Sequence, residues 1–173
     1  MASPADIILL LDAGPLITLA YADALDVLAR PGWTVKVVDM VLAEVTRQET
    51  PTSRKLKAWS SNVPLIGTRT FARYQAMQSE GETPLRTAHL GELAIQEVMH
   101  DFALSVPPVS GVFLFEDHKI ARAGFLLPEH CQKVSTRAFL LFLEEQGYIG
   151  SAAEIEAAAI RAGRNFSRLR FPP

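Results

Sequence analysis

The sequence has few of the features that would place it in several common protein classes. It contains a single cysteine, Cys131, so no disulfide can form within the chain, and we expect a reducing compartment, the cytoplasm. The first apolar run, residues 7–11, is short and has no basic segment before it, unlike a signal peptide or a membrane span. We therefore expect no membrane association, and we expect Cys131 to act as a small buried residue.

Motifs of several enzyme classes are also missing. The segment DAGPL, which follows the first apolar run, lacks the glycine-rich turn of a dinucleotide site, and neither a Walker-type phosphate loop nor a GxSxG elbow occurs. No set of histidines and cysteines is present that would hold zinc. The formal net charge of −2 argues against a surface that is basic all over, but it is compatible with a local basic patch.

What the sequence does contain is an alternation of apolar strands and amphipathic helices. Hydrophobic residues make up 49% of the 173 residues, enough for the core of one domain over 1–173, with 151–173 as a terminal helix and tail. The pattern predicts an α/β fold, an α/β/α sandwich with a mostly parallel central sheet and a helical C-terminal extension. Strands are expected at 7–11, 34–38, 63–66, 111–116 and 132–135, helices at 15–29, 39–48, 52–61, 88–104, 117–124, 136–146 and 151–162, and a helix with a loop at 68–86.

Acidic residues follow two of the predicted strands. Asp12 comes directly after strand 7–11, and Asp117 comes after strand 111–116, with Glu116 beside it. In parallel α/β folds, functional residues gather at the carboxyl ends of the strands. A carboxylate at the end of an apolar strand loses hydration unless something pairs with it, and a hard divalent cation is one such partner. Taken singly, each aspartate is explained equally well as a helix N-cap.

Acids on two predicted helices extend this set. Glu44 lies near the apolar residues Met40 and Val41, where an unpaired carboxylate would be poorly placed. Glu92 follows Gly91 at the edge of an apolar helix face, and we expect Gly91 to let that helix pack closely on the sheet, bringing Glu92 near the strand ends. For each of these acids, a solvated position at the edge of an amphipathic helix is the alternative.

Several segments, in this order, resemble the PIN-domain family: LLDAGPLITLA, LAEV, HLGELAIQEV, FLFEDHKIARAGF and STRAFLLFLEEQGYIG. The resemblance covers nearly the whole chain. It implies that Asp12, Glu44, Glu92 and Asp117 form a four-carboxylate site for Mg²⁺ or Mn²⁺, whereas the role of Glu116 stays open. The polar stretch 68–86 is longer than in compact members of the family.

The resemblance further implies an endoribonuclease that hydrolyses RNA phosphodiesters, in the manner of the VapC-like toxins that an antitoxin protein silences, and a homodimer. The basic residues nearest to the candidate acids, Arg47, Lys119 and Arg122, are the expected RNA contacts. Ser135 and Thr136 are candidates either for a ligand contact at a strand end or for helix capping. The alternative function is a catalytically weak PIN-like scaffold or protein-binding module.

Overall fold

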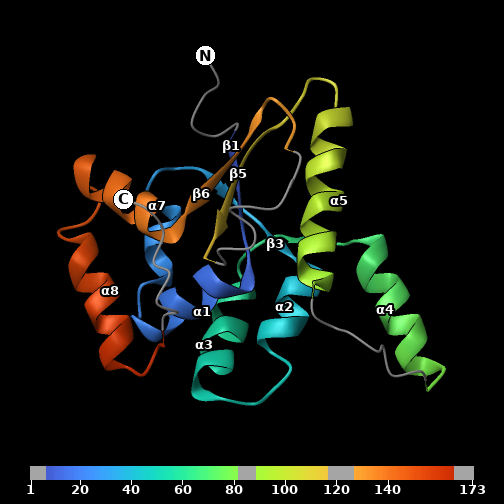
Figure 1. Cartoon of the computed structure of the whole chain (residues 1–173), viewed down its shortest axis with the longest axis horizontal. Helices are drawn as coiled ribbons and strands as arrows, with labels where there is room; N and C mark the ends of the chain where they lie inside the picture. Colours follow the sequence, from blue (N-terminus) through green and yellow to red (C-terminus); the bar gives the residue numbers. More distant parts are fainter. Residues whose placement is uncertain (1–6, 82–88, 117–126, 166–173) are drawn as a thin grey trace.

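A parallel β-sheet runs through the centre of the protein (Figure 1). The computed structural model describes residues 7–81, 89–116 and 127–165. Each neighbouring pair of the main sheet is parallel, and the spatial order is β2-β1-β5-β6. The strands are β1 (Ile7–Leu11), β2 (Thr34–Val35), β5 (Ser110–Phe115) and β6 (Cys131–Ser135), and a smaller parallel pair consists of β3 (Val37–Val38) and β4 (Leu65–Ile66).

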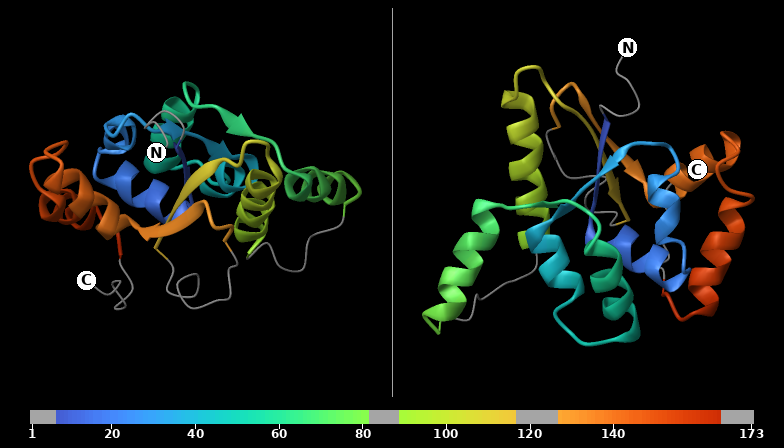
Figure 2. Two further views of the ribbon diagram at one scale, coloured as in Figure 1. Left: turned by 90° about the horizontal axis from the view of Figure 1, so that it is seen from above. Right: turned by 180° about the vertical axis from the view of Figure 1, so that it is seen from behind.

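Helices cover both sides of this sheet (Figure 2). The views agree that α5 and α4 lie on one side and α7 and α8 on the other. The helices are α1 (Ala13–Tyr21), α2 (Asp39–Val45), α3 (Pro51–Ser60), α4 (Arg69–Ser79), α5 (Leu90–Leu104), α7 (Thr136–Glu145) and α8 (Ala152–Arg161), with the short 3-10 helix η2 (Leu25–Ala29). The predicted α/β class with a mostly parallel central sheet is therefore confirmed.

Burial explains why the central strands are so apolar. Leu9, Leu10 and Leu11 of β1 are completely or almost completely buried, as expected for a strand that is covered on both faces. At Gly111 of β5, a β-carbon would lie 3.2 Å from the Met99 sulfur, so the glycine allows α5 to approach the sheet closely. The Cys131 thiol is buried as predicted, and this burial raises its pKa.

Two of the expected elements are divided in the structure. The helix predicted at 15–29 ends at Tyr21, because Asp23 adopts a left-handed backbone conformation with φ of 58°, and η2 follows. The strand predicted at 34–38 divides at Lys36: β2 pairs with β1, whereas β3 pairs with β4. Within 68–86, α4 accounts for the predicted helix, and the helix predicted at 117–124 lies outside the described residues.

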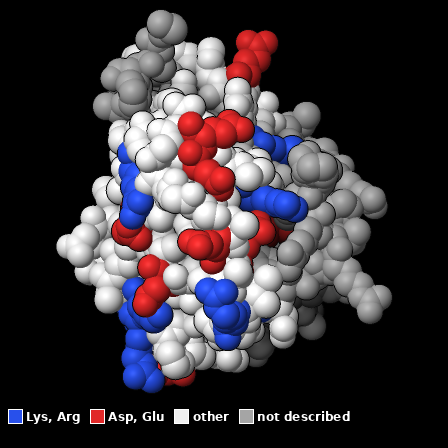
Figure 3. Space-filling model, turned by 90° about the vertical axis from the view of Figure 1, so that its left-hand side faces the viewer, with Lys and Arg blue, Asp and Glu red and all other residues white. Residues whose placement is uncertain are grey.

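The predicted C-terminal helix is docked on the domain. α8 packs against both α1 and α7, and Ala152 and Ala159 on its inner face are buried. Acidic and basic side chains occur side by side on the face that carries these C-terminal helices (Figure 3). Among the described residues, no helix combines the length and apolarity that crossing a membrane requires.

Candidate acidic site at the carboxyl end of the sheet

Asp12 and Glu116 lie at the carboxyl ends of two adjacent strands. β1 and β5 are paired in parallel, and the Asp12 amide donates a hydrogen bond of 2.9 Å to the Leu114 carbonyl. Asp12 occupies the N-cap position of α1, but its side chain makes no capping hydrogen bond. Asp12 therefore precedes α1 as an N-cap residue does, but its carboxylate does not act as the cap.

The Glu116 carboxylate is fixed by two other parts of the chain. Its side chain is only 13% exposed. Oε2 accepts a hydrogen bond of 2.9 Å from Thr18 Oγ1 on α1 and one of 3.1 Å from Arg164 Nη2, which follows α8. The other oxygen, Oε1, is buried without a hydrogen-bond partner among the described residues. Two partners from separate parts of the chain thus hold Oε2, whereas Oε1 has no partner in the described part of the chain.

A second pair of acids comes from helices α2 and α5. At Gly91, in the first turn of α5, a β-carbon would lie 2.9 Å from Glu44 Oε2, so the Glu44 carboxylate rests against this glycine. The resulting loss of solvent raises the pKa of Glu44; the positive charge of Arg47 lowers it, and the negative charge of Glu92 raises it further. Glu44 and Glu92 are therefore close enough to repel each other.

Gly14 has a similar role to that of Gly91. A β-carbon on Gly14 would lie 3.0 Å from Glu116 Cβ and 3.2 Å from Glu116 Oε2. Each of the two glycines thus makes room for the side chain of an acid from another element. We expected Gly91 to let α5 pack closely on the sheet, and this was wrong. The atoms that face Gly91 belong to Glu44 and Val41, so the close contact is with α2.

All four described acids lie towards one end of the molecule. In the lower half of Figure 1, β1 and β5 end beside α1 and α2, and the first turn of α5, which contains Glu92, lies at the same end. Asp117, the fourth predicted ligand, lies outside the described residues, as do Lys119 and Arg122. Of the predicted RNA-binding cations, Arg47 is described, and its charge acts on Glu44.

Polar groups near these acids have defined roles. His89 Nδ1 lies 3.3 Å from Glu92 Oε2, an ion pair only when the imidazole is protonated. Ser135 caps α7, because its Oγ accepts a hydrogen bond of 3.1 Å from the Ala138 amide. Thr136 Oγ1 is buried without a hydrogen-bond partner among the described residues. The capping alternative is thus confirmed for Ser135, and a ligand contact stays a prediction for Thr136.

Two other acids, of which Asp39 is buried and Glu97 half-buried, have structural roles. Asp39 accepts three hydrogen bonds of 2.7 Å, one from the Met40 amide and two from the amide and the hydroxyl of Thr68. The bonds to Thr68 connect the start of α2 to the start of α4. Glu97 on α5 accepts hydrogen bonds from the Arg69 and Thr70 amides at the N-terminus of α4. Neither residue was singled out from the sequence, since their partners come from distant segments.

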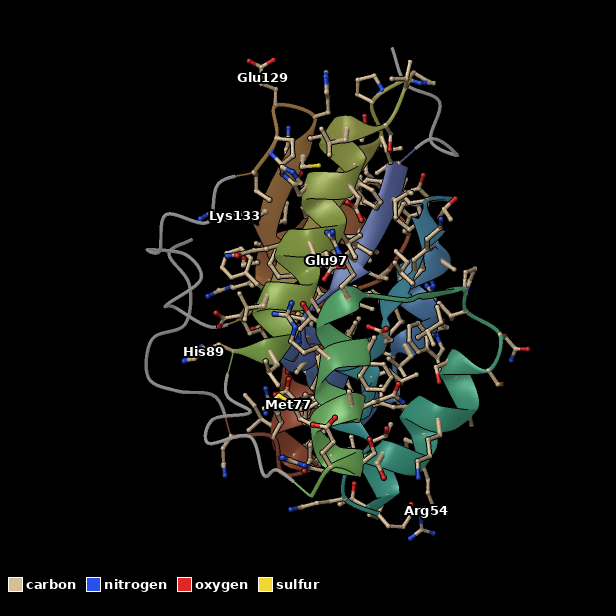
Figure 4. The ribbon with its side chains drawn as sticks, turned by 90° about the vertical axis from the view of Figure 1, so that its right-hand side faces the viewer. Arg54, Met77, His89, Glu97, Glu129 and Lys133 are labelled. Carbon is tan, nitrogen blue, oxygen red and sulfur yellow. The ribbon has the colours of Figure 1, made fainter. Side chains whose placement is uncertain are left out.

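A groove lies between α4, α5 and residues 127–128. Figure 4 shows one of its lining residues, Glu97, beside the upper end of α4. Its walls combine cationic, polar and apolar side chains: Arg69, Thr70, Arg73, Leu93, Gln96, Glu97, His100, Ala103, Leu127 and Pro128. Leu93 is 51% exposed and lies on the exposed face of α5, together with Gln96 and His100. The groove is a candidate surface for a substrate or a protein partner.

The donor set of the acidic site suits a hard divalent cation. All candidate ligands are carboxylate oxygens, which Mg²⁺ and Mn²⁺ prefer, and the buried Glu116 Oε1 lacks a protein donor among the described residues. Within that same part of the chain, no group of three or more acidic, histidine or cysteine side chains is close enough together to hold a metal ion. The sequence matches no protein-family model and no curated protein.

Proposed function

We propose that this protein is an Mg²⁺- or Mn²⁺-dependent endoribonuclease of the PIN kind. One observation carries the proposal: carboxylates from separate elements gather at the carboxyl end of a parallel sheet, and Glu44 and Glu92 lie close enough to repel each other. Such repulsion destabilises an empty site, so it is typical of acids that a cation neutralises. The order of the PIN-like motifs along the chain supports the same function.

In this function, Asp12 and Asp117 would be the central ligands, and Glu44 and Glu92 would complete the site directly or through water. These four carboxylates would hold the divalent cation, which when bound would supply water activation and charge neutralisation for phosphodiester hydrolysis. Arg47, whose positive charge acts on Glu44, is the proposed contact that would attract an RNA phosphate to the edge of the acidic site. Lys119 and Arg122, which follow Asp117 in the sequence, are proposed as further phosphate contacts.

Cleavage of a mixed panel of structured and single-stranded RNAs tests the proposal. The purified protein is assayed with Mg²⁺, with Mn²⁺ and with EDTA, next to an Asp12→Asn/Asp117→Asn double variant. We expect cleavage that depends on the metal and is lost in the variant. Equal cleavage by both proteins would identify a contaminating nuclease, and failure of the wild type to bind metal or to cut any RNA would refute the proposed activity. A parallel panel of DNA substrates establishes whether the specificity is for RNA.

A PIN-like module that binds a protein partner is the second candidate. The exposed Leu93 in the groove beside α4 and α5 favours it, since a partner would cover this apolar surface. The VapC-like toxin role unites the two candidates, because an antitoxin is then the protein that binds and silences the nuclease. Light scattering on the purified chain tests the proposed homodimer, and co-expression with the product of a neighbouring gene tests for an antitoxin.

A further inference from the structure

Arg164 connects the end of the chain to the acidic site. It follows α8 and is 146 residues away in the sequence from Thr18, yet Arg164 Nε donates a hydrogen bond of 3.0 Å to Thr18 Oγ1. Its Nη2 atom lies 3.1 Å from Glu116 Oε2. The side chains of Arg164 and Glu116 are 23% and 13% exposed, so solvent screens this ion pair less than a pair on the surface.

The arrangement constrains one carboxylate oxygen and leaves the other for a ligand. Thr18 and Arg164 both donate to Glu116 Oε2, whereas Oε1 is buried without a hydrogen-bond partner among the described residues. A buried oxygen of an ionised carboxylate without a donor is unfavourable, unless another group binds it. Gly14 adds to the constraint, since any side chain there would approach both Cβ and Oε2 of Glu116.

A second buried oxygen lies on the neighbouring strand end. Thr136 Oγ1 also has no hydrogen-bond partner in the described part of the chain. Glu116 and Thr136 directly follow Phe115 and Ser135, which are paired in register between β5 and β6. Within the described residues, two adjacent strand ends therefore each present a buried oxygen without a partner, an arrangement that a cation or its bound water would satisfy.

We propose that Arg164 is a positioning residue, which fixes Glu116 Oε2 so that Oε1 becomes an additional ligand of the divalent cation at the acidic site. The inference rests on the proposed function and adds Glu116 to the predicted ligands. Partners that orient a metal ligand through its second oxygen commonly tune metal affinity in this way. Arg164 thereby couples the docking of the C-terminal segment to the metal site.

Calorimetric titration of the full-length protein with Mn²⁺ alone, in the absence of nucleic acid, tests the inference. We expect Glu116→Gln, which preserves the shape of the side chain, to weaken Mn²⁺ binding by about 10–100-fold. Arg164→Gln should weaken Mn²⁺ binding by a similar factor. Arg164→Lys keeps the positive charge but cannot contact Thr18 and Glu116 with two separate nitrogens, so it should retain part of the wild-type affinity. Arg161→Gln, at the end of α8, is the matched control and should bind Mn²⁺ like the wild type.

Melting temperatures in EDTA separate positioning from simple tethering. Arg164→Gln leaves Glu116 without its cation and should melt earlier, and the double variant Glu116→Gln/Arg164→Gln should recover stability but not metal affinity. An Arg164→Gln protein that melts earlier yet binds Mn²⁺ like the wild type would show that the ion pair only ties the C-terminal segment down, which overturns the inference.

The proposed nuclease function can stand when this inference fails. If Asp12→Asn abolishes Mn²⁺ binding while Glu116→Gln leaves it unchanged, Glu116 is not a ligand and the inference alone is refuted. If the wild type itself does not bind Mn²⁺, the inference and the metal-dependent function are both refuted.

Discussion

Gly91 and Glu44 lie in direct contact, although they belong to different helices. A β-carbon on Gly91 would lie 2.9 Å from Glu44 Oε2, a separation that no real side chain tolerates without a shift. The carboxylate end of a glutamate is flexible, so the relief would come from rotation of Glu44 and not from movement of the helix. The absence of a side chain at residue 91 therefore determines where the Glu44 carboxylate lies in relation to Glu92.

Gly91→Ala should reduce cleavage with little effect on folding. The added methyl group displaces the Glu44 carboxylate, while alanine in the first turn of α5 is compatible with the helix backbone and reduces the freedom of the unfolded chain. We expect metal-dependent cleavage to fall by about 10-fold or more and the melting temperature to stay close to that of the wild type. Gly150→Ala is the matched control, because a β-carbon there meets no atom within 4 Å. Equal loss of activity in both variants would contradict the role given to Gly91.

Asp39 and Asp12 should respond in opposite ways to mutation. Asp39→Ala removes a buried acceptor from three hydrogen bonds of 2.7 Å, and we expect the free energy of unfolding to fall by about 2–3 kcal/mol. Asp12→Asn should leave stability unchanged or slightly higher in EDTA and abolish cleavage. Urea denaturation and RNA cleavage measured on both variants check this. Gross unfolding of Asp12→Asn would mean that Asp12 is a structural residue and not a metal ligand.

The sequence was sufficient to predict the elements that are set by local patterns. The continuous apolar run of residues 7–11 correctly indicates a buried parallel strand, and the amphipathic stretch near Gly91 correctly indicates the longest helix. The break at Asp23 was not predictable, since residues 15–29 keep a helical pattern of apolar side chains through it. The division at Lys36 depends on which strands the two halves pair with, and this is a tertiary property.

For the candidate site, sequence reasoning selected candidate acids but not their partners. Asp12 and Glu116 can be placed at one sheet edge from the rule that parallel strands end together. The contact of Glu116 with Arg164 joins residues 48 positions apart and has no sequence signal. Similarly, the pattern around Gly91 suggested packing on the sheet, whereas the partner is Glu44, because only the folded arrangement of α2 and α5 decides which atoms face the glycine.

The raised pKa of Glu44 predicts how stability depends on pH. Desolvation first, and then repulsion by Glu92, disfavours the charged form in the folded protein, despite the opposing charge of Arg47. The folded state therefore holds its proton to a higher pH than the unfolded state, so stability is lost as the pH rises above the unfolded value of 4.5. In EDTA, Glu44→Gln should raise the melting temperature at pH 7 by only about 1–3 °C, because solvent screens this partly exposed group. At pH 4 the variant should melt like the wild type, because the Glu44 carboxyl is then protonated in the folded protein. Differential scanning calorimetry measures both, and an equal gain at the two pH values would exclude the electrostatic cause.

Glu97 should show the opposite dependence on pH. Burial acts to raise its pKa, but hydrogen bonds from the amides and side chains of Arg69 and Thr70 outweigh burial and lower the pKa from 4.5 to about 2. The stabilisation is therefore complete above pH 4.5 and is lost as the pH falls towards about 2. Glu97→Gln should lower the free energy of unfolding by about 1.5–3 kcal/mol at pH 7, with a smaller loss at pH 3, since part of the wild-type carboxylate is then protonated. Glu80→Gln at the end of α4 is the exposed control. Urea denaturation at the two pH values gives the comparison, and a loss that is equal at both would show that the side chain stabilises α4 through packing and not through its charge.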